Sequence, residues 1–210
     1  MISKVTRNFL LIFMLVGFYG NAAATATPDE VVKMTANGVI ERIKQERAVL
    51  KNEPEKLYAL IEELVIPNFD FISMSKWVLG KNWKSASDVQ RTDFVEQFKT
   101  LLVNTYAKAL LEYSDQEIKF YPAEPSSKPN LAVVRTELTS SSAQPFPVAY
   151  RMYQKNDRWR VVDVTVDGVS LVSTYRGSFA TQIKKDGFDS LLQQLADKNA
   201  KLETDLKSGG

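Results

Sequence analysis

The sequence predicts an α+β fold, with helices at both ends of the chain and an antiparallel sheet formed by the middle. Apolar residues recur at helical spacing up to about residue 113 and again after residue 170. Between residues 117 and 167 they alternate with a period of two, which is typical of strands. Because the strands are segregated from the helices along the chain, the sequence predicts the α+β class.

The first 26 residues have the three-part layout of a secretory signal. Lys4 and Arg7 give a positive start, and the apolar run Phe9–Phe18 is interrupted only by Gly17. Small residues then form two Ala-x-Ala frames, which predict cleavage after Ala24 or Ala26. The apolar run is much shorter than the roughly 20 residues of a membrane-spanning helix. We therefore expect a signal peptide over residues 1–26 and an exported chain without an anchor.

Composition narrows the function classes. The chain has 27 basic and 25 acidic residues, and the predicted signal holds two of the basic ones, so the mature protein is nearly neutral. A basic footprint for nucleic acid is absent. The chain has no cysteine and no histidine. It therefore lacks disulfides, the usual general base and the commonest zinc ligand.

Helices are predicted before and after the strands along the chain. The first begins at Pro28, a residue suited to the first helical position, and Asp70 can cap a short helix that ends at Gly80. Ser87 and Gln90 resemble a capping box that starts a long helix. The predicted helices cover residues 28–50, 54–66, 70–80, 87–113, 171–185 and 188–206, and residues 207–210 are a loose tail. The first helix has the apolar stripe Val32, Ala36, Val39, Ile40 and Ile43.

Four strands are predicted, over residues 117–121, 131–138, 147–154 and 158–166. Asn156 and Asp157 favour a tight hairpin turn between the last two. Simple alternation in the last strand places Trp159 and Val161 on one face, and Val162, Val164 and Val166 on the other. A sheet with apolar residues on both faces must be covered on both faces or must hold an apolar ligand. The pattern alone leaves both interpretations open.

Three acidic residues are the only plausible catalysts: Asp70, Asp163 and Asp167. A carboxylate pair could hydrolyse glycosides, but we favour cap, turn and ion-pair roles for these residues because the sequence supplies no partner at a diagnostic spacing. Asp163 lies among valines and needs a partner there. We expect Arg176 to pair with it, with Arg160 as the second candidate. The sequence has no glycine-rich phosphate loop, metal cluster or nucleophile elbow. We therefore predict that the protein has no catalytic site and no metal site and is not an enzyme.

An ordered set of motifs resembles the MlaC family, the toluene-tolerance proteins. The resemblance spans nearly the whole mature chain, and each motif is weak alone but specific in order. The motifs are Ile66–Phe71, Met74-Ser75, Val78–Trp83, Gln90-Arg91, Phe94, Phe98, Leu102, Tyr106, Tyr150, Trp159–Val164, Asp167–Val172, Tyr175-Arg176 and Phe179. One departure is Asp167-Gly168, where the family pattern has Glu-Gly.

The resemblance implies a periplasmic phospholipid carrier with a curved, NTF2-like sheet packed with helices around an apolar pocket. Its implied partners are phospholipid, an inner-membrane ABC transporter complex with an MCE-domain protein, and an outer-membrane lipoprotein–porin complex. Its implied role is to maintain the lipid asymmetry of the outer membrane. It implies no cofactor apart from the bound phospholipid. Two other functions remain open: an NTF2-like hydrolase or isomerase, and a chaperone for hydrophobic segments.

We expect the pocket wall to be formed by aromatic residues, which suit a flexible apolar ligand, together with aliphatic residues of the strands and the long helix. These predicted wall residues are Trp77, Phe98, Leu102, Tyr106, Val133, Tyr150, Trp159, Val161 and Val164.

Overall fold

The computed structural model describes residues 26–111, 117–140 and 143–207. The predicted signal peptide lies outside the described residues except for Ala26, as do Tyr113 and the last three residues of the tail. None of the helices in the described ranges is long and apolar enough to cross a membrane.

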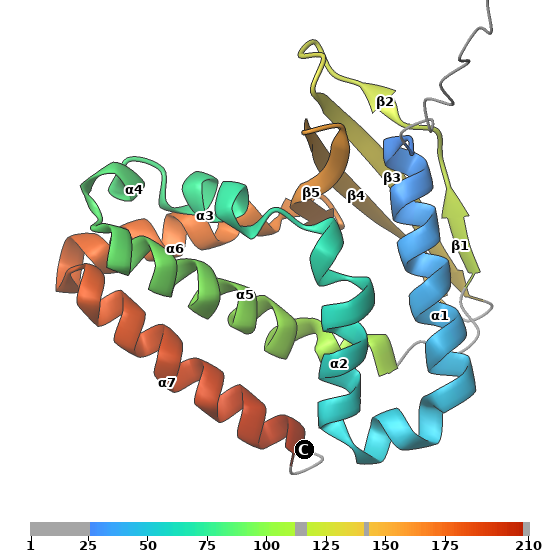
Figure 1. Ribbon diagram of the computed structural model, residues 1–210, viewed down its shortest axis with the longest axis horizontal. Helices are drawn as coiled ribbons and strands as arrows, with labels where there is room; N and C mark the ends of the chain where they lie inside the picture. The colour runs from blue at the N-terminus through green and yellow to red at the C-terminus, as the bar shows by residue number, and fades with distance from the viewer. Residues whose placement is uncertain (1–25, 112–116, 141–142, 208–210) are drawn as a thin grey trace, which may run out of the picture.

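The helical elements agree closely with the expected ones (Figure 1). They are α1 Pro28–Asn52, α2 Pro54–Leu64, the 3-10 helix η1 Ile66–Asn68, α3 Phe71–Leu79, α4 Asn82–Ser85, α5 Asp88–Leu111, α6 Leu171–Asp186 and α7 Phe188–Lys207. The expected caps explain the agreement. Asp70 accepts the N–H of Ser73 at 2.9 Å, and Ser87 and Gln90 exchange hydrogen bonds of 2.9 and 3.2 Å.

The strands form one antiparallel sheet in the order β1-β3-β4-β5-β6, with β2 paired to β3. They are β1 Glu117–Phe120, β2 Glu124–Pro125, β3 Leu131–Ser140, β4 Ala143–Lys155, β5 Arg158–Val166 and β6 Val169–Ser170. Asn156 and Asp157 both have positive φ, as a two-residue hairpin between β4 and β5 requires. The predicted α+β class with a curved antiparallel sheet is therefore confirmed.

The sheet is covered on its two faces by different helices. In Figure 1, α1 crosses in front of the sheet, and α5, α6 and α7 extend to one side. Val161 of β5 packs in a buried cluster with Val32 of α1, whereas the neighbouring Val162 packs in the core formed by α3, α5, α6 and α7. The two faces of β5 thus contribute to different parts of the interior.

A β-bulge in β5 changes the expected alternation. Met152 of β4 pairs with Val161, but Arg151 pairs with Asp163, so Val162 is an extra residue without a partner on β4. Beyond the bulge the strand continues with its side chains in the opposite phase. Val161 and Val164 therefore share one face, although simple alternation had placed them on opposite faces.

Candidate functional site

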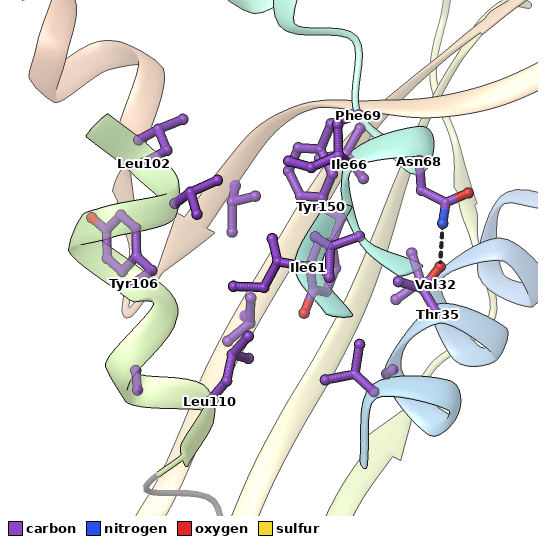
Figure 2. A pocket seen from close by; sticks show the side chains of 18 of the residues that line it. Val32, Thr35, Ile61, Ile66, Asn68, Phe69, Leu102, Tyr106, Leu110 and Tyr150 are labelled. Atoms are coloured by element: carbon purple, nitrogen blue, oxygen red, sulfur yellow. Dashed lines mark hydrogen bonds between the residues drawn. The ribbon is translucent and has the colours of Figure 1, made fainter. Parts of the chain in front are cut away.

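A cavity of about 430 Å³ lies between α1, α2, the second half of α5 and one face of the sheet. Figure 2 shows α5 on one side, with Leu102, Tyr106 and Leu110, and α1 on the other, with Val32 and Thr35. Most lining side chains are aliphatic or aromatic, and none of the described residues that line the cavity is charged. The site is an apolar chamber.

Helix α1 supplies one whole wall of this cavity. All five residues of its predicted apolar stripe line the cavity: Val32, Ala36, Val39, Ile40 and Ile43. Sequence reasoning identified the stripe but left it out of the pocket wall, because a helix that packs on a core and a helix that lines a cavity have the same periodicity. The small residue Ala36 in the middle of the stripe is the feature of the sequence that could have indicated a cavity beside this helix.

The sheet supplies a further wall through alternate residues of its strands. Tyr150 of β4 pairs with Val164 of β5, and both line the cavity. Val161 joins them because of the bulge. The backbone N–H of Asp70 donates to the carbonyl of Val161 at 2.9 Å, which attaches the segment before α3 to β5 beside the bulge.

The few polar groups in the lining already have partners. The amide of Asn68 donates to the hydroxyl of Thr35 and to the carbonyl of Leu64, both at 2.9 Å, and Figure 2 shows the first of these bonds. The Thr35 hydroxyl donates to the carbonyl of Val31 at 2.8 Å. Burial raises the pKa of Tyr150, and its hydrogen bond with Thr136 acts in the other direction. The cavity therefore offers a ligand apolar contact rather than hydrogen bonds or charge.

The structure brings five of the nine predicted wall residues into the lining: Leu102, Tyr106, Tyr150, Val161 and Val164. The other four lie elsewhere. Phe98 belongs to the helical core, where its ring lies 5.7 Å from Phe94 and 5.3 Å from Tyr175 between centroids. Phe98 lies on α5 one turn before Leu102, and its ring packs against Tyr175 and Phe179 of α6.

Trp77, Val133 and Trp159 are also outside the lining. Val133 alternates with the buried Val134, which packs on the α1 side, so it lies on the opposite face of the sheet. Trp77 is on α3, where the guanidinium of Arg151 lies 5.9 Å from its ring centroid. Trp159 packs beside Val161 but lies nearer the hairpin, beyond the point where Phe69 pairs with Val161.

The expected Asp163–Arg176 pair is not among the contacts of the described residues. The Asp163 carboxylate accepts from the hydroxyl of Ser170 at 2.7 Å and from the N–H of Val172 at 3.1 Å, and the guanidinium of Arg151 lies 3.9 Å away. Arg176 lies further along α6 on its exposed side, with its guanidinium against Gly80. The start of α6 lies next to the carboxylate because Ser170, the last residue of β6, is also the N-cap of α6.

The three acidic residues do not assemble a catalytic pair. Asp70 caps α3, Asp167 has a positive φ in the turn after β5, and Asp163 points to the face of the sheet opposite Val164 and the cavity. The described residues contain no group of three or more acidic side chains that could hold a metal ion. The chemistry that this site supports is apolar binding.

Comparison with known proteins agrees with this geometry. The family model described as "MlaC protein" matches residues 33–197. The toluene tolerance protein Ttg2D of Pseudomonas putida is 28% identical over 190 residues, which are 90% of this chain and 87% of that protein. The intermembrane phospholipid transport system binding protein MlaC of Haemophilus influenzae is 24% identical over 191 residues, which are 89% of each chain.

A solved structure has the same fold. It is a phospholipid-binding protein from Ralstonia solanacearum in complex with a phospholipid, and it superposes with a TM-score of 0.78 at 28% identity. The match covers 85% of this chain and 99% of that one.

Proposed function

The chain belongs to the MlaC protein family, and from this premise we propose that it is a periplasmic carrier that encloses the acyl chains of a phospholipid. The observation that supports the proposal is the uncharged apolar cavity of about 430 Å³ between α1, α5 and the sheet. A relative with the same fold was solved in complex with a phospholipid. An apolar cavity with satisfied polar groups suits acyl chains better than any polar ligand.

The energetics of lipid transfer explain why such a carrier is needed. A diacyl phospholipid has roughly 30 methylenes, and exposing each to water costs about 0.8 kcal/mol, so free transit through water costs on the order of 25 kcal/mol. A protein cavity replaces one apolar environment with another. Transfer to and from membranes can then run close to equilibrium.

We propose membrane-bound complexes as the donors and acceptors of this lipid. One relative is named as the binding protein of an intermembrane phospholipid transport system. The partners we propose are an inner-membrane ABC transporter complex with an MCE-domain protein and an outer-membrane lipoprotein–porin complex, and the role is to maintain outer-membrane lipid asymmetry. Pull-down with each complex, using the mature protein with and without lipid, measures these contacts directly.

We propose a binding role without catalysis. The cavity has no acidic or basic side chain among its described lining residues, and Asp163 faces the other side of the sheet. A general acid or base must lie within hydrogen-bond reach of the reacting group. The hydrolase or isomerase alternative therefore has no carboxylate base among the described residues that line the cavity.

The carrier function is tested by measuring the lipid content of protein purified without detergent from the periplasm of the bacterium that makes it. We expect extraction and mass spectrometry to find diacyl phospholipid at close to one molecule per chain. Amino-terminal sequencing of the same sample is expected to begin at Thr25 or Thr27, directly after the predicted cleavage sites. Stable protein that contains no lipid and takes up none from vesicles would contradict the proposal.

A further inference from the structure

The face of the sheet turned away from the cavity carries several cations near the hairpin between β4 and β5. Tyr153 of β4 pairs with Arg160 of β5, and nearer the hairpin Lys155 pairs with Arg158. Paired residues point to the same face, and alternation along β4 places both pairs on one face. Val161, which follows Arg160, lines the cavity, so the two pairs lie on the opposite face of the sheet.

Most of these cations lack an anionic partner. Arg151 shares their face of β4, and its guanidinium lies 3.9 Å from the carboxylate of Asp163. Lys155, Arg158 and Arg160 form no ion pair with any described residue. The Nε of Arg160 is also buried without a hydrogen-bond partner in the described part of the chain. Because the mature chain is nearly neutral overall, this group is a local excess of positive charge that attracts anions.

An open pocket adjoins this group of cations. It is lined by Trp77 of α3, Tyr153 of β4 and the turn Lys128–Leu131. Both aromatic side chains are half-buried, and the guanidinium of Arg151 lies 5.9 Å from the centroid of the Trp77 ring. Tyr153 belongs to the pocket and also pairs with Arg160, so the apolar and the cationic groups form one surface. Such a surface suits a ligand that combines an apolar group with negative charge.

The pocket favours a protein partner over a lipid surface. The exposed large apolar side chains of the described residues are Met34, Ile72, Val89, Tyr106, Phe146 and Val169, and none of them lines the pocket. A surface that lies on a membrane needs protruding apolar groups that enter the lipid. Here the rings are recessed, so a projecting side chain of a partner can enter the pocket. Aromatic and arginine residues are also the types enriched at protein–protein interfaces.

We propose that this surface docks an acidic segment of a partner protein, with one apolar side chain in the pocket and carboxylates on the arginines. Arginine suits this role because its guanidinium holds a carboxylate through two parallel hydrogen bonds. The inference rests on the proposed carrier function, which requires docking to membrane-bound complexes, and it names the chemistry of one docking site. Docking on this face leaves the lipid cavity on the other face of the sheet free.

The test uses the mature protein with its lipid and three fluorescein-labelled peptides. The first has a phenylalanine between two pairs of glutamates, the second has glutamines in place of the glutamates, and the third has alanine in place of the phenylalanine. We expect fluorescence anisotropy to show one site per chain for the first peptide and binding about tenfold weaker for each of the others. Raising the salt concentration from about 0.1 M to about 1 M should also weaken the first peptide, because the screening length shortens from about 10 Å to about 3 Å.

Charge variants locate the anion-binding part of the surface. Lys155→Ser with Arg158→Ser removes two exposed cations beside the pocket and should weaken the first peptide about tenfold. Lys184→Ser with Lys185→Ser is the matched control, since it removes two exposed cations from the end of α6 and should leave binding unchanged. Asp157→Asn removes the negative charge that the hairpin carries next to these cations and should strengthen binding about twofold.

A second matched pair of variants locates the apolar side chain of the peptide. Asn130 is exposed and lines the pocket, whereas Ser127 is exposed in the same turn and lies outside the lining. Asn130→Trp places a large ring in the pocket and should weaken the first peptide about tenfold, and Ser127→Trp should not. Circular dichroism checks that each variant is folded.

The outcomes separate the inference from the function it rests on. Peptide binding that both the charge variant at 155 and 158 and Asn130→Trp leave unchanged would place the peptide elsewhere and overturn the inference. Binding to phosphatidylglycerol vesicles without binding to the peptide would assign the cations to a membrane and would overturn it as well. Protein that retains phospholipid but binds no peptide refutes the inference and leaves the carrier function standing. Protein that holds and takes up no lipid refutes the carrier function, whatever the peptide does.

Discussion

The hydroxyl of Ser170 donates a hydrogen bond of 2.7 Å to the buried carboxylate of Asp163. The same hydroxyl accepts the N–H of Ser173 at 3.0 Å, so it also caps α6. The second carboxylate oxygen accepts the N–H of Val172 at 3.1 Å. Asp163 therefore fastens the start of α6 to β5, on the side of the sheet away from the cavity.

Asp163→Asn should lower the free energy of unfolding by about 1–3 kcal/mol, because an amide cannot accept both hydrogen bonds. Urea unfolding followed by circular dichroism measures the loss. Asp167→Asn is the matched control: Asp167 has a φ of 48°, which asparagine also tolerates, so its stability should not change. Abolished turnover of an ester or glycoside by Asp163→Asn, with stability intact, would contradict the structural role.

The partner of Asp163 is tested by double-mutant cycles. Asp163→Asn with Ser170→Ala should cost less than the sum of the single changes, since the two side chains share a hydrogen bond. Asp163→Asn with Arg176→Gln should be additive, because Arg176 lies against Gly80. Coupling between Asp163 and Arg176 would restore the pair that the sequence predicted.

Val164→Glu should abolish copurification of lipid, because it places a carboxylate in the apolar lining. Val133→Glu introduces the same group on the opposite face of the sheet and should retain lipid. Phosphorus analysis of the purified variants measures lipid content, and circular dichroism confirms that both are folded. Equal lipid loss in both variants would show that the face assignment is wrong.

Much of this fold could be predicted because its element boundaries depend on local chemistry. Asp70 and the Ser87–Gln90 box cap their helices, and Asn156 and Asp157 adopt the positive φ of a tight hairpin. Each of these residues acts within a few positions of itself. The bounds of the predicted helices and strands followed from residues of this kind, whereas α4, β2 and β6 lie outside every predicted element.

The pocket could be predicted only in part because it depends on contacts between distant elements. The bulge at Val162 reverses the phase of β5, and no residue type in that strand marks it. Both faces of the sheet carry apolar residues, so Val133 and Val164 could not be told apart by pattern. The partner of Asp163 likewise depended on how β6 leads into α6.

Gly80→Ala should lower stability by about 1–3 kcal/mol, because Gly80 has a φ of 55° and a ψ of −120°, a conformation that side chains disfavour. A Cβ there would also lie 3.0 Å from Arg176, whose flexible end can move aside. Arg176→Gln should therefore recover little of the loss. Gly177→Ala, within α6 and with open space around it, should instead stabilise by about 0.5–1 kcal/mol. Thermal unfolding of the unchanged protein, Gly80→Ala, Gly80→Ala with Arg176→Gln, and Gly177→Ala checks these signs. If the double variant recovered the stability lost in Gly80→Ala, the loss would be due to the contact with Arg176 and not to the backbone conformation.

Tyr150→Phe should reduce the loss of stability at alkaline pH. Burial raises the pKa of Tyr150 above its usual value of 10.0, so the folded state holds this proton more tightly than the unfolded state. The resulting stability is complete below pH 10.0 and is lost as pH rises through the higher folded pKa. Phenylalanine has no proton to lose, so the unfolding free energy of the Tyr150→Phe protein should fall less steeply between pH 10.0 and the folded pKa. The missing hydrogen bond with Thr136 lowers the unfolding free energy of this variant by about 1 kcal/mol at every pH. Urea unfolding of both proteins on either side of pH 10.0 measures the difference in slope. Parallel curves would mean that the Tyr150 hydroxyl is solvated rather than enclosed by the cavity wall.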